Sequence, residues 1–121
     1  MKRHKVMVIE DDREIREALL ELLEDHGCEV VGASNGERAL AYLKSTDSLP
    51  CLILLDLMMP VMDGHAFREA QFQDPVLAKI PVVVVSAYRD VQANAEKLKA
   101  ATYIKKPPKL EELTSAIAQH C

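Results

Sequence analysis

Five polar residues directly follow apolar runs of the sequence and could together handle a phosphoryl group. Glu10 and Asp11 follow the first run, Asp56 the third, Ser86 the fourth and Lys106 the fifth. Three carboxylates brought together repel one another, by about 1 kcal/mol per pair at ~4 Å in water and several-fold more at low dielectric. They therefore need a cation, and oxygen ligands suit a hard ion such as Mg²⁺. Lys106 would add positive charge and Ser86 a hydroxyl donor, as phosphoryl transfer requires.

The runs before these residues predict a parallel sheet. They are short and rich in β-branched residues, each is followed by a stretch of helical periodicity, and they cover residues 5–9, 28–32, 51–55, 81–85 and 102–105. Because the third and fourth runs have no polar face, helices must cover both sides of the sheet. Right-handed crossovers then favour a doubly wound α/β sandwich that binds ligands at the carboxyl ends of its strands. A strand order of 2-1-3-4-5 would bring the three carboxylates together.

The helical stretches have recognisable apolar faces and ends. For the first helix we predict Asp12 as the cap, Gly27 as the end and an inward face of Ile15, Ala18, Leu19, Leu22 and Leu23. Residues 34–37 are typical of a capping box that opens the second helix, with Ala39, Leu40 and Leu43 inward. The third helix should cover about residues 63–73. Shorter fourth and fifth helices should bury Val91, Ala95 and Leu98, and then Leu110, Leu113 and Ile117.

Length and charge limit the classes of protein. A chain of 121 residues fits one domain, which we expect over residues 1–121. The net charge of −4, without a Lys/Arg block, disfavours nucleic-acid binding. The first apolar run is too short for a signal peptide, and no stretch approaches the ~20 apolar residues of a membrane helix, so we expect a cytoplasmic protein.

The cysteines and histidines show no metal-type spacing. Cys28, Cys51 and Cys121 are an odd number, which favours reduced thiols: the first two as small buried residues and the third at a frayed end. The four histidines are scattered, and none has a partner at ligand spacing.

The order and separation of the polar motifs resemble the receiver domain of response regulators. These motifs are the Glu10-Asp11 pair, Asp56 within the segment LLDLMMPVMDG, the Ser86-Ala87 step and the Lys106-Pro107 step. The resemblance covers essentially the whole chain. It implies a flavodoxin-like (βα)5 sandwich with strand order 2-1-3-4-5, similar to stand-alone chemotaxis regulators.

The resemblance also implies an activity. Asp56 would accept a phosphoryl group from a sensor histidine kinase, a histidine phosphotransfer protein or a small phosphodonor, with Mg²⁺ or Mn²⁺ bound. Such a protein is a signalling switch in a two-component phosphorelay rather than an enzyme. Its phosphorylation would control binding to a downstream protein partner.

Roles around the phosphoryl group follow from the same resemblance. Asp11, the Asp56 carboxylate and the backbone carbonyl of Met58 would ligate the metal ion, and Glu10 would hold it through water. Lys106 would pair with one phosphoryl oxygen. Ser86 would move inward to donate a hydrogen bond to another.

Further residues correspond to positions that report or time the signal. Tyr103 corresponds to the aromatic switch residue, which turns from exposed to buried and changes the surface of helix four, strand five and helix five. A phosphorylation-dependent dimer would form there. Pro107 corresponds to a proline after a cis peptide bond. Met58 and Tyr88 flank the path of the hydrolytic water, and because neither can orient that water, we predict slow self-dephosphorylation.

Two departures from the family pattern stand out. The turn over residues 98–102 lacks the usual glycine, and the spacing from Ser86 to Lys106 is short by about two residues. We therefore expect helix four to be truncated or displaced. At Pro107-Pro108, a second proline stands where an aromatic residue is common.

Other interpretations remain open at the level of sequence. Asp56 and Ser86 could each simply cap a helix, and Lys106 could be a solvated charge. A pseudo-receiver would bind partners without phosphorylation. A Mg²⁺-dependent phosphatase or mutase would carry an acid two residues after its aspartyl nucleophile, where this chain has Met58.

Overall fold

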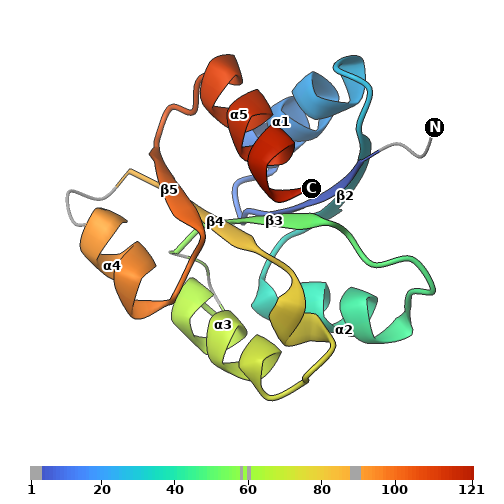
Figure 1. The fold of residues 1–121 in the computed structure, drawn as a ribbon, viewed down its shortest axis with the longest axis vertical. Helices are drawn as coiled ribbons and strands as arrows, with labels where there is room; N and C mark the ends of the chain where they lie inside the picture. Colours follow the sequence, from blue (N-terminus) through green and yellow to red (C-terminus); the bar gives the residue numbers. More distant parts are fainter. Residues whose placement is uncertain (1–3, 58, 60, 88–90) are drawn as a thin grey trace.

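The computed structural model describes residues 4–57, 59, 61–87 and 91–121, and these form a three-layer α/β sandwich. One parallel sheet has the strand order β2-β1-β3-β4-β5. The helices α1 and α5 cover one face, and α2, α3 and α4 cover the other (Figure 1). The predicted doubly wound, flavodoxin-like architecture is confirmed.

The five strands lie close to the predicted runs. They are β1 (Lys5–Ile9), β2 (Glu29–Ala33), β3 (Leu52–Leu55), β4 (Val82–Ser86) and β5 (Thr102–Lys105). Alternate residues of β1 face opposite layers: Val6 and Val8 pack with α1 and α5, whereas Met7 and Ile9 pack with α2 and α3. Burial on both faces explains why these strands carry no polar side.

The helices are α1 (Arg13–Asp25), α2 (Gly36–Ser45), α3 (Gly64–Phe72), α4 (Val91–Lys97) and α5 (Leu110–His120), with a short 3₁₀ helix at Leu77–Lys79. Three begin at side-chain caps. Asp12, Asn35 and Asp63 each accept a hydrogen bond from a backbone N–H three residues on, at 2.9–3.1 Å. The cap predicted at Asp12 is confirmed, and in α2 the capping residue is Asn35.

The inward face of α1 differs from the prediction. Leu19 and Leu23 are buried as expected, but Ile15 is 37% exposed and Ala18 is also exposed. The helix is turned so that Leu20 and Arg16 lie over Gly32 of β2. A Cβ atom at Gly32 would lie 2.8 Å from Leu20 Cδ1. Because Gly32 has no side chain, Leu20 and Arg16 can approach β2 closely. The helix is therefore rotated so that part of its most apolar face, at Ile15 and Ala18, points to solvent.

The turn between α4 and β5, which lacks a glycine, is held by hydrogen bonds from a side chain of α3. Helix α4 has seven residues, and Lys99 after it has a positive φ of 55°. The guanidinium of Arg68 in α3, which is 5% exposed, donates hydrogen bonds to the carbonyls of Leu98 at 2.9 Å and Lys99 at 3.0 Å. Arg68 also donates to Gln71 Oε1 at 2.7 Å. The Arg68 side chain of α3 thus satisfies two carbonyls just after the end of α4.

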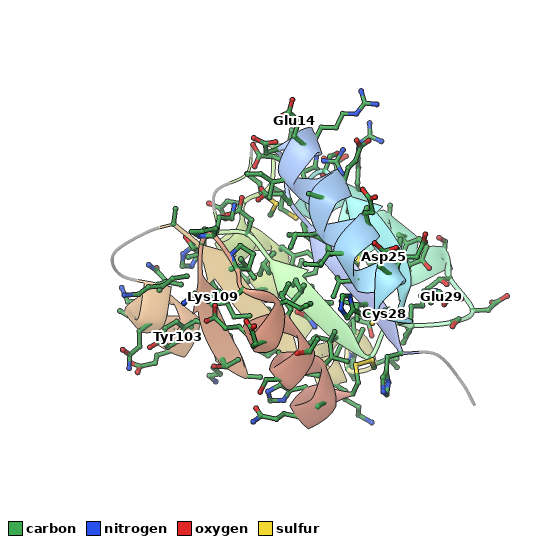
Figure 2. The ribbon with its side chains drawn as sticks, turned by 90° about the horizontal axis from the view of Figure 1, so that it is seen from above. Glu14, Asp25, Cys28, Glu29, Tyr103 and Lys109 are labelled. Atoms are coloured by element: carbon green, nitrogen blue, oxygen red, sulfur yellow. A yellow bond between two sulfur atoms is a disulfide. The ribbon has the colours of Figure 1, made fainter. Side chains whose placement is uncertain are left out.

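The expectation of reduced cysteines is wrong for two of the three. Cys51 and Cys121 form a disulfide across 70 residues, with Cα atoms 5.1 Å apart, and Figure 2 draws this bond in yellow beside the end of α5. Cys28 lies outside this disulfide and is buried, as predicted. The fold brings the beginning of β3 next to the end of α5, a proximity that cysteine spacing does not reveal. Among the described residues, no helix is long and apolar enough to cross a membrane.

Candidate functional site

The carboxyl ends of β1 and β3 bring the acidic residues together. Because Ile9 pairs with Leu55, the next residues, Glu10 and Asp56, leave the sheet side by side. The backbone N–H of Asp56 donates to the Ile9 carbonyl at 3.0 Å. Glu10, Asp11 and Asp56 each present a carboxylate oxygen within 4.8 Å of the others. Glu10 and Asp56 are buried, and Asp11 is exposed.

Lys106 reaches this cluster from the end of β5. Its ammonium group donates a hydrogen bond to Glu10 Oε1 and lies 3.5 Å from Asp56 Oδ2. Its backbone N–H donates to the Ser86 carbonyl at 3.0 Å, and the Lys106–Pro107 peptide bond is cis. Burial alone would lower the pKa of Lys106, but the hydrogen bond with Glu10 and the charge of Asp56 outweigh it and raise the pKa.

The burial and charge crowding of the cluster act most clearly on Glu10. Burial, followed by the neighbouring Asp56, raises the pKa of Glu10, while Lys106 acts in the opposite direction. Its second oxygen, Oε2, is buried without a hydrogen-bond partner among the described residues. A buried oxygen without a partner among the described residues, beside two further carboxylates and Lys106, fits a bound divalent cation. The described members of the predicted ligand set are thus compatible with Mg²⁺.

The loop after Asp56 is held by close backbone contacts. The N–H of Gly64 donates to the Leu57 carbonyl at 3.0 Å, which closes the loop onto the first turn of α3. A Cβ atom at Gly64 would lie 3.0 Å from both the Asp56 carbonyl and Leu57 Cα. A larger residue would crowd this backbone, so glycine favours the close approach. In the sequence, Gly64 stands out only as the last residue of the segment LLDLMMPVMDG.

Arg16 is a second residue that sequence analysis missed. Its guanidinium donates to the Glu10 carbonyl at 2.8 Å and so fixes the backbone that carries the acidic pair. Only its position one turn after the acidic pair could have suggested this contact, because arginine on a helix is usually solvated.

Ser86 and Tyr103 lie on the α4 side of the cluster. Ser86 is 1% exposed at the end of β4. Tyr103 is half-buried next to α4 (Figure 2), and its hydroxyl donates to Gln92 Oε1 at 3.4 Å. Its ring packs against the cluster formed by Leu57, Val84, Val91, Ala95 and Leu98. The predicted roles of Met58 and Tyr88 fall outside the described residues.

Fold and site together define a flavodoxin-like α/β protein with a carboxylate cluster and a lysine at the switch point of its sheet. The family model described as the response regulator receiver domain matches residues 6–118, and the chain belongs to this family.

Two sequence relatives and one solved structure illustrate the similarity. Protein PilG of Pseudomonas aeruginosa is 35% identical over 96% of this chain and 86% of its own length. The ycf27 protein of Porphyridium aerugineum is 34% identical over 97% of this chain, which spans only 48% of the length of ycf27. The crystal structure of response regulator TrrA from Thermotoga maritima, in complex with Mg²⁺ and BeF, has a TM-score of 0.84 at 25% identity, covering 98% of this chain and 99% of that one.

Proposed function

We propose that Asp56 is the phosphoacceptor of this receiver domain and that its phosphorylation switches a protein-binding surface. One observation carries the proposal. The Asp56 carboxylate is buried at the edge of the sheet between an acidic pair and the ammonium of Lys106, which lies 3.5 Å from Asp56 Oδ2. An aspartate that only caps a helix does not need these charged neighbours, whereas a carboxylate that attacks a phosphoryl group does.

The reaction is a displacement at phosphorus. An Asp56 oxygen attacks, the P–N bond of a phosphohistidine in a kinase or phosphotransfer protein breaks, and an aspartyl phosphate forms on Asp56. Lys106 can exchange its contact with Asp56 for one with a phosphoryl oxygen. Ser86, at the end of β4, is the hydroxyl that would donate to another oxygen. Bound Mg²⁺ would neutralise charge on the transferring group.

Residues of the cluster would hold that ion. Glu10, Asp11 and Asp56 offer oxygens within 4.8 Å of one another. The buried Glu10 Oε2 has no hydrogen-bond partner in the described part of the chain, and an ion or its water could supply one. The Met58 carbonyl completes the proposed ligand set. The TrrA structure, which contains Mg²⁺ and BeF, supports this assignment by its likeness.

The readout would pass through α4 and β5. Charge added at Asp56 would draw Ser86 toward the phosphoryl group. Tyr103 could then move into the space that Ser86 leaves and give up its hydrogen bond to Gln92. A downstream partner, or a second copy of this chain, would then bind the altered surface of α4, β5 and α5.

Acetyl phosphate provides a test without a known kinase. The chain is incubated with acetyl phosphate and Mg²⁺ or Mn²⁺, and added phosphoryl groups are counted by intact mass spectrometry. We expect one group on the wild type and on Asp47→Asn, which removes an exposed carboxylate before β3. Asp56→Asn should take up none. Labelling of Asp56→Asn equal to wild type, or no metal-dependent labelling of the wild type, would overturn the proposal.

A further inference from the structure

Two sulfur atoms and an imidazole gather at the edge of the sheet opposite the carboxylate cluster. His4 precedes β1, Cys51 precedes β3 and Cys121 follows α5. A ring nitrogen of His4 and the two Sγ atoms all lie within 4.8 Å of one another. This edge holds the amino ends of the strands, so the group is separated from Asp56 by the length of β3.

Backbone hydrogen bonds fix all three positions. The Cys51 N–H donates to the Lys5 carbonyl at 2.9 Å, and the Glu29 N–H donates to the His4 carbonyl at 2.8 Å. The Cys121 N–H donates to the Ile117 carbonyl at 2.9 Å, which extends the last turn of α5. Three different elements thus present the three side chains, and little ordering is left to be done when a ligand binds.

The sulfur atoms are joined in this structure, and a dithiol reductant can open the bond. The reductant gives up two electrons and two protons, becomes a disulfide itself, and leaves Cys51 and Cys121 as thiols. Their Cα atoms are 5.1 Å apart, so the freed sulfurs stay neighbours. Two sulfurs bound to one tetrahedral zinc ion at ~2.3 Å are separated by about 3.8 Å, which requires only a small movement of either side chain.

We propose that the reduced protein binds a zinc ion through Cys51 Sγ, Cys121 Sγ and a ring nitrogen of His4. Binding releases the two thiol protons, and the fourth tetrahedral position stays open to water. Thiolate and imidazole ligands select a soft or borderline ion, whereas the all-oxygen cluster around Asp56 selects a hard one. The two edges of the sheet would therefore hold different metals.

The site would make zinc binding and oxidation mutually exclusive. The disulfide removes both thiolates from the ligand set, so only the reduced chain offers a site. In either state a link joins the beginning of β3 to the end of α5, whose residues Leu113, Ala116 and Ile117 pack in the core.

Cobalt spectroscopy on the full chain tests the proposal. The protein is reduced with a phosphine, separated from it without oxygen, and titrated with Co²⁺ in excess Mg²⁺, which keeps the carboxylate cluster occupied. Zinc affinity is then measured by competition with a chromophoric chelator. We expect one equivalent of Co²⁺ with a thiolate-to-metal charge-transfer band, displaced by Zn²⁺, and no band from the oxidised protein.

Variants distinguish this site from chance thiol binding. Cys51→Ser should remove the charge-transfer band, and His4→Ala should weaken zinc binding by about 10- to 100-fold or more, since even loss of a partner that only orients a ligand has that effect. His120→Ala and Cys28→Ala are controls that should bind zinc as the wild type does. Because His4 is exposed, its replacement leaves the core intact, and circular dichroism checks the fold of each variant. Absence of the band in the reduced wild type, or equal affinity of His4→Ala and wild type, would overturn the proposal.

Discussion

Replacing Lys106 by methionine tests the charge balance of the proposed phosphorylation site. The substitution keeps an unbranched side chain but removes the ammonium that contacts Glu10 and Asp56. At 3.5 Å the attraction between Lys106 and Asp56 is about 5 kcal/mol at an effective dielectric constant of ~20. The net loss is smaller, because a half-buried ammonium no longer has to be desolvated.

Protonation of Glu10 sets an upper limit to the cost of leaving this carboxylate unpaired. With an ordinary pKa of ~4.3, neutralising a glutamate costs about 3.7 kcal/mol at pH 7 and about 1.6 kcal/mol at pH 5.5. We therefore expect Lys106→Met to lower the free energy of unfolding by about 2–3 kcal/mol at pH 7 and by about 1 kcal/mol at pH 5.5.

The sign of the pH dependence follows from the shifted pKa values. The pKa of Lys106 is raised, so its stabilising contribution is complete below the ordinary lysine range and is lost only as the pH rises through its folded value. The contribution of Lys106 to stability is therefore constant between pH 5.5 and 7. The pKa of Glu10 is also raised, so protonation favours the folded state at low pH and this gain is lost as the pH rises. In Lys106→Met, the stability lost through deprotonation of Glu10 between pH 5.5 and 7 should be larger than in the wild type.

Urea unfolding measures both effects. Wild type, Lys106→Met and Lys105→Met are compared at both pH values without Mg²⁺, and then with it at pH 7. Lys105 is the matched control, because it is the neighbouring lysine and is exposed. Mg²⁺ should restore part of the stability of Lys106→Met. The reasoning is refuted if Lys106→Met and Lys105→Met have the same stability at pH 7, or if Lys106→Met has the same cost at both pH values.

Three further predictions concern the timing of the signal and the end of α4. The double variant Met58→Asn/Tyr88→Glu should lose its phosphoryl group several-fold faster than wild type, measured by intact mass after removal of acetyl phosphate; an unchanged rate would exclude the role given to these residues. Arg68→Met should lower the free energy of unfolding by about 3 kcal/mol, since it leaves buried acceptors unpaired, whereas the exposed Arg38→Met should have little effect. Lys99→Gly should raise stability by about 0.5–1 kcal/mol, because glycine tolerates the positive φ there, and a destabilised variant in urea unfolding would contradict this.

The strands and the proximity of the acidic residues could be predicted because both follow from short-range patterns and topology. An apolar run without a polar face must be covered on both sides, and once β1 and β3 are neighbours their following residues must meet. The bounds of β1 and β5 are as predicted. The strands β2 and β4 each begin and end one residue later than predicted, and their last residues, Ala33 and Ser86, still pair with the adjacent strand. The strand β3 begins one residue later, at Leu52.

Contacts that depend on tertiary placement could not be predicted. Arg68 and Gln71 are polar residues that periodicity would assign to solvent, yet both are buried. Arg68 donates to the Leu98 carbonyl just after α4. Gln71 donates to the carbonyls of Leu77, in the 3₁₀ helix, and Ile80, which follows that helix. Ile15 is exposed because Gly32 lets Arg16 and Leu20 approach the sheet instead. The disulfide of Cys51 depends on where α5 ends, 70 residues further along the chain.

Chemical trapping of the phosphorylated residue tests the central role of Asp56 most directly. Borohydride reduces an acyl phosphate to an alcohol, so an aspartyl phosphate becomes homoserine, which peptide mass spectrometry locates in the sequence. After treatment with acetyl phosphate and Mg²⁺, we expect homoserine at position 56 and at neither Asp11 nor Asp63. Homoserine at another position with Asp56 unmodified, in a protein that carries a phosphoryl group, would contradict the assignment of Asp56 as the phosphoacceptor.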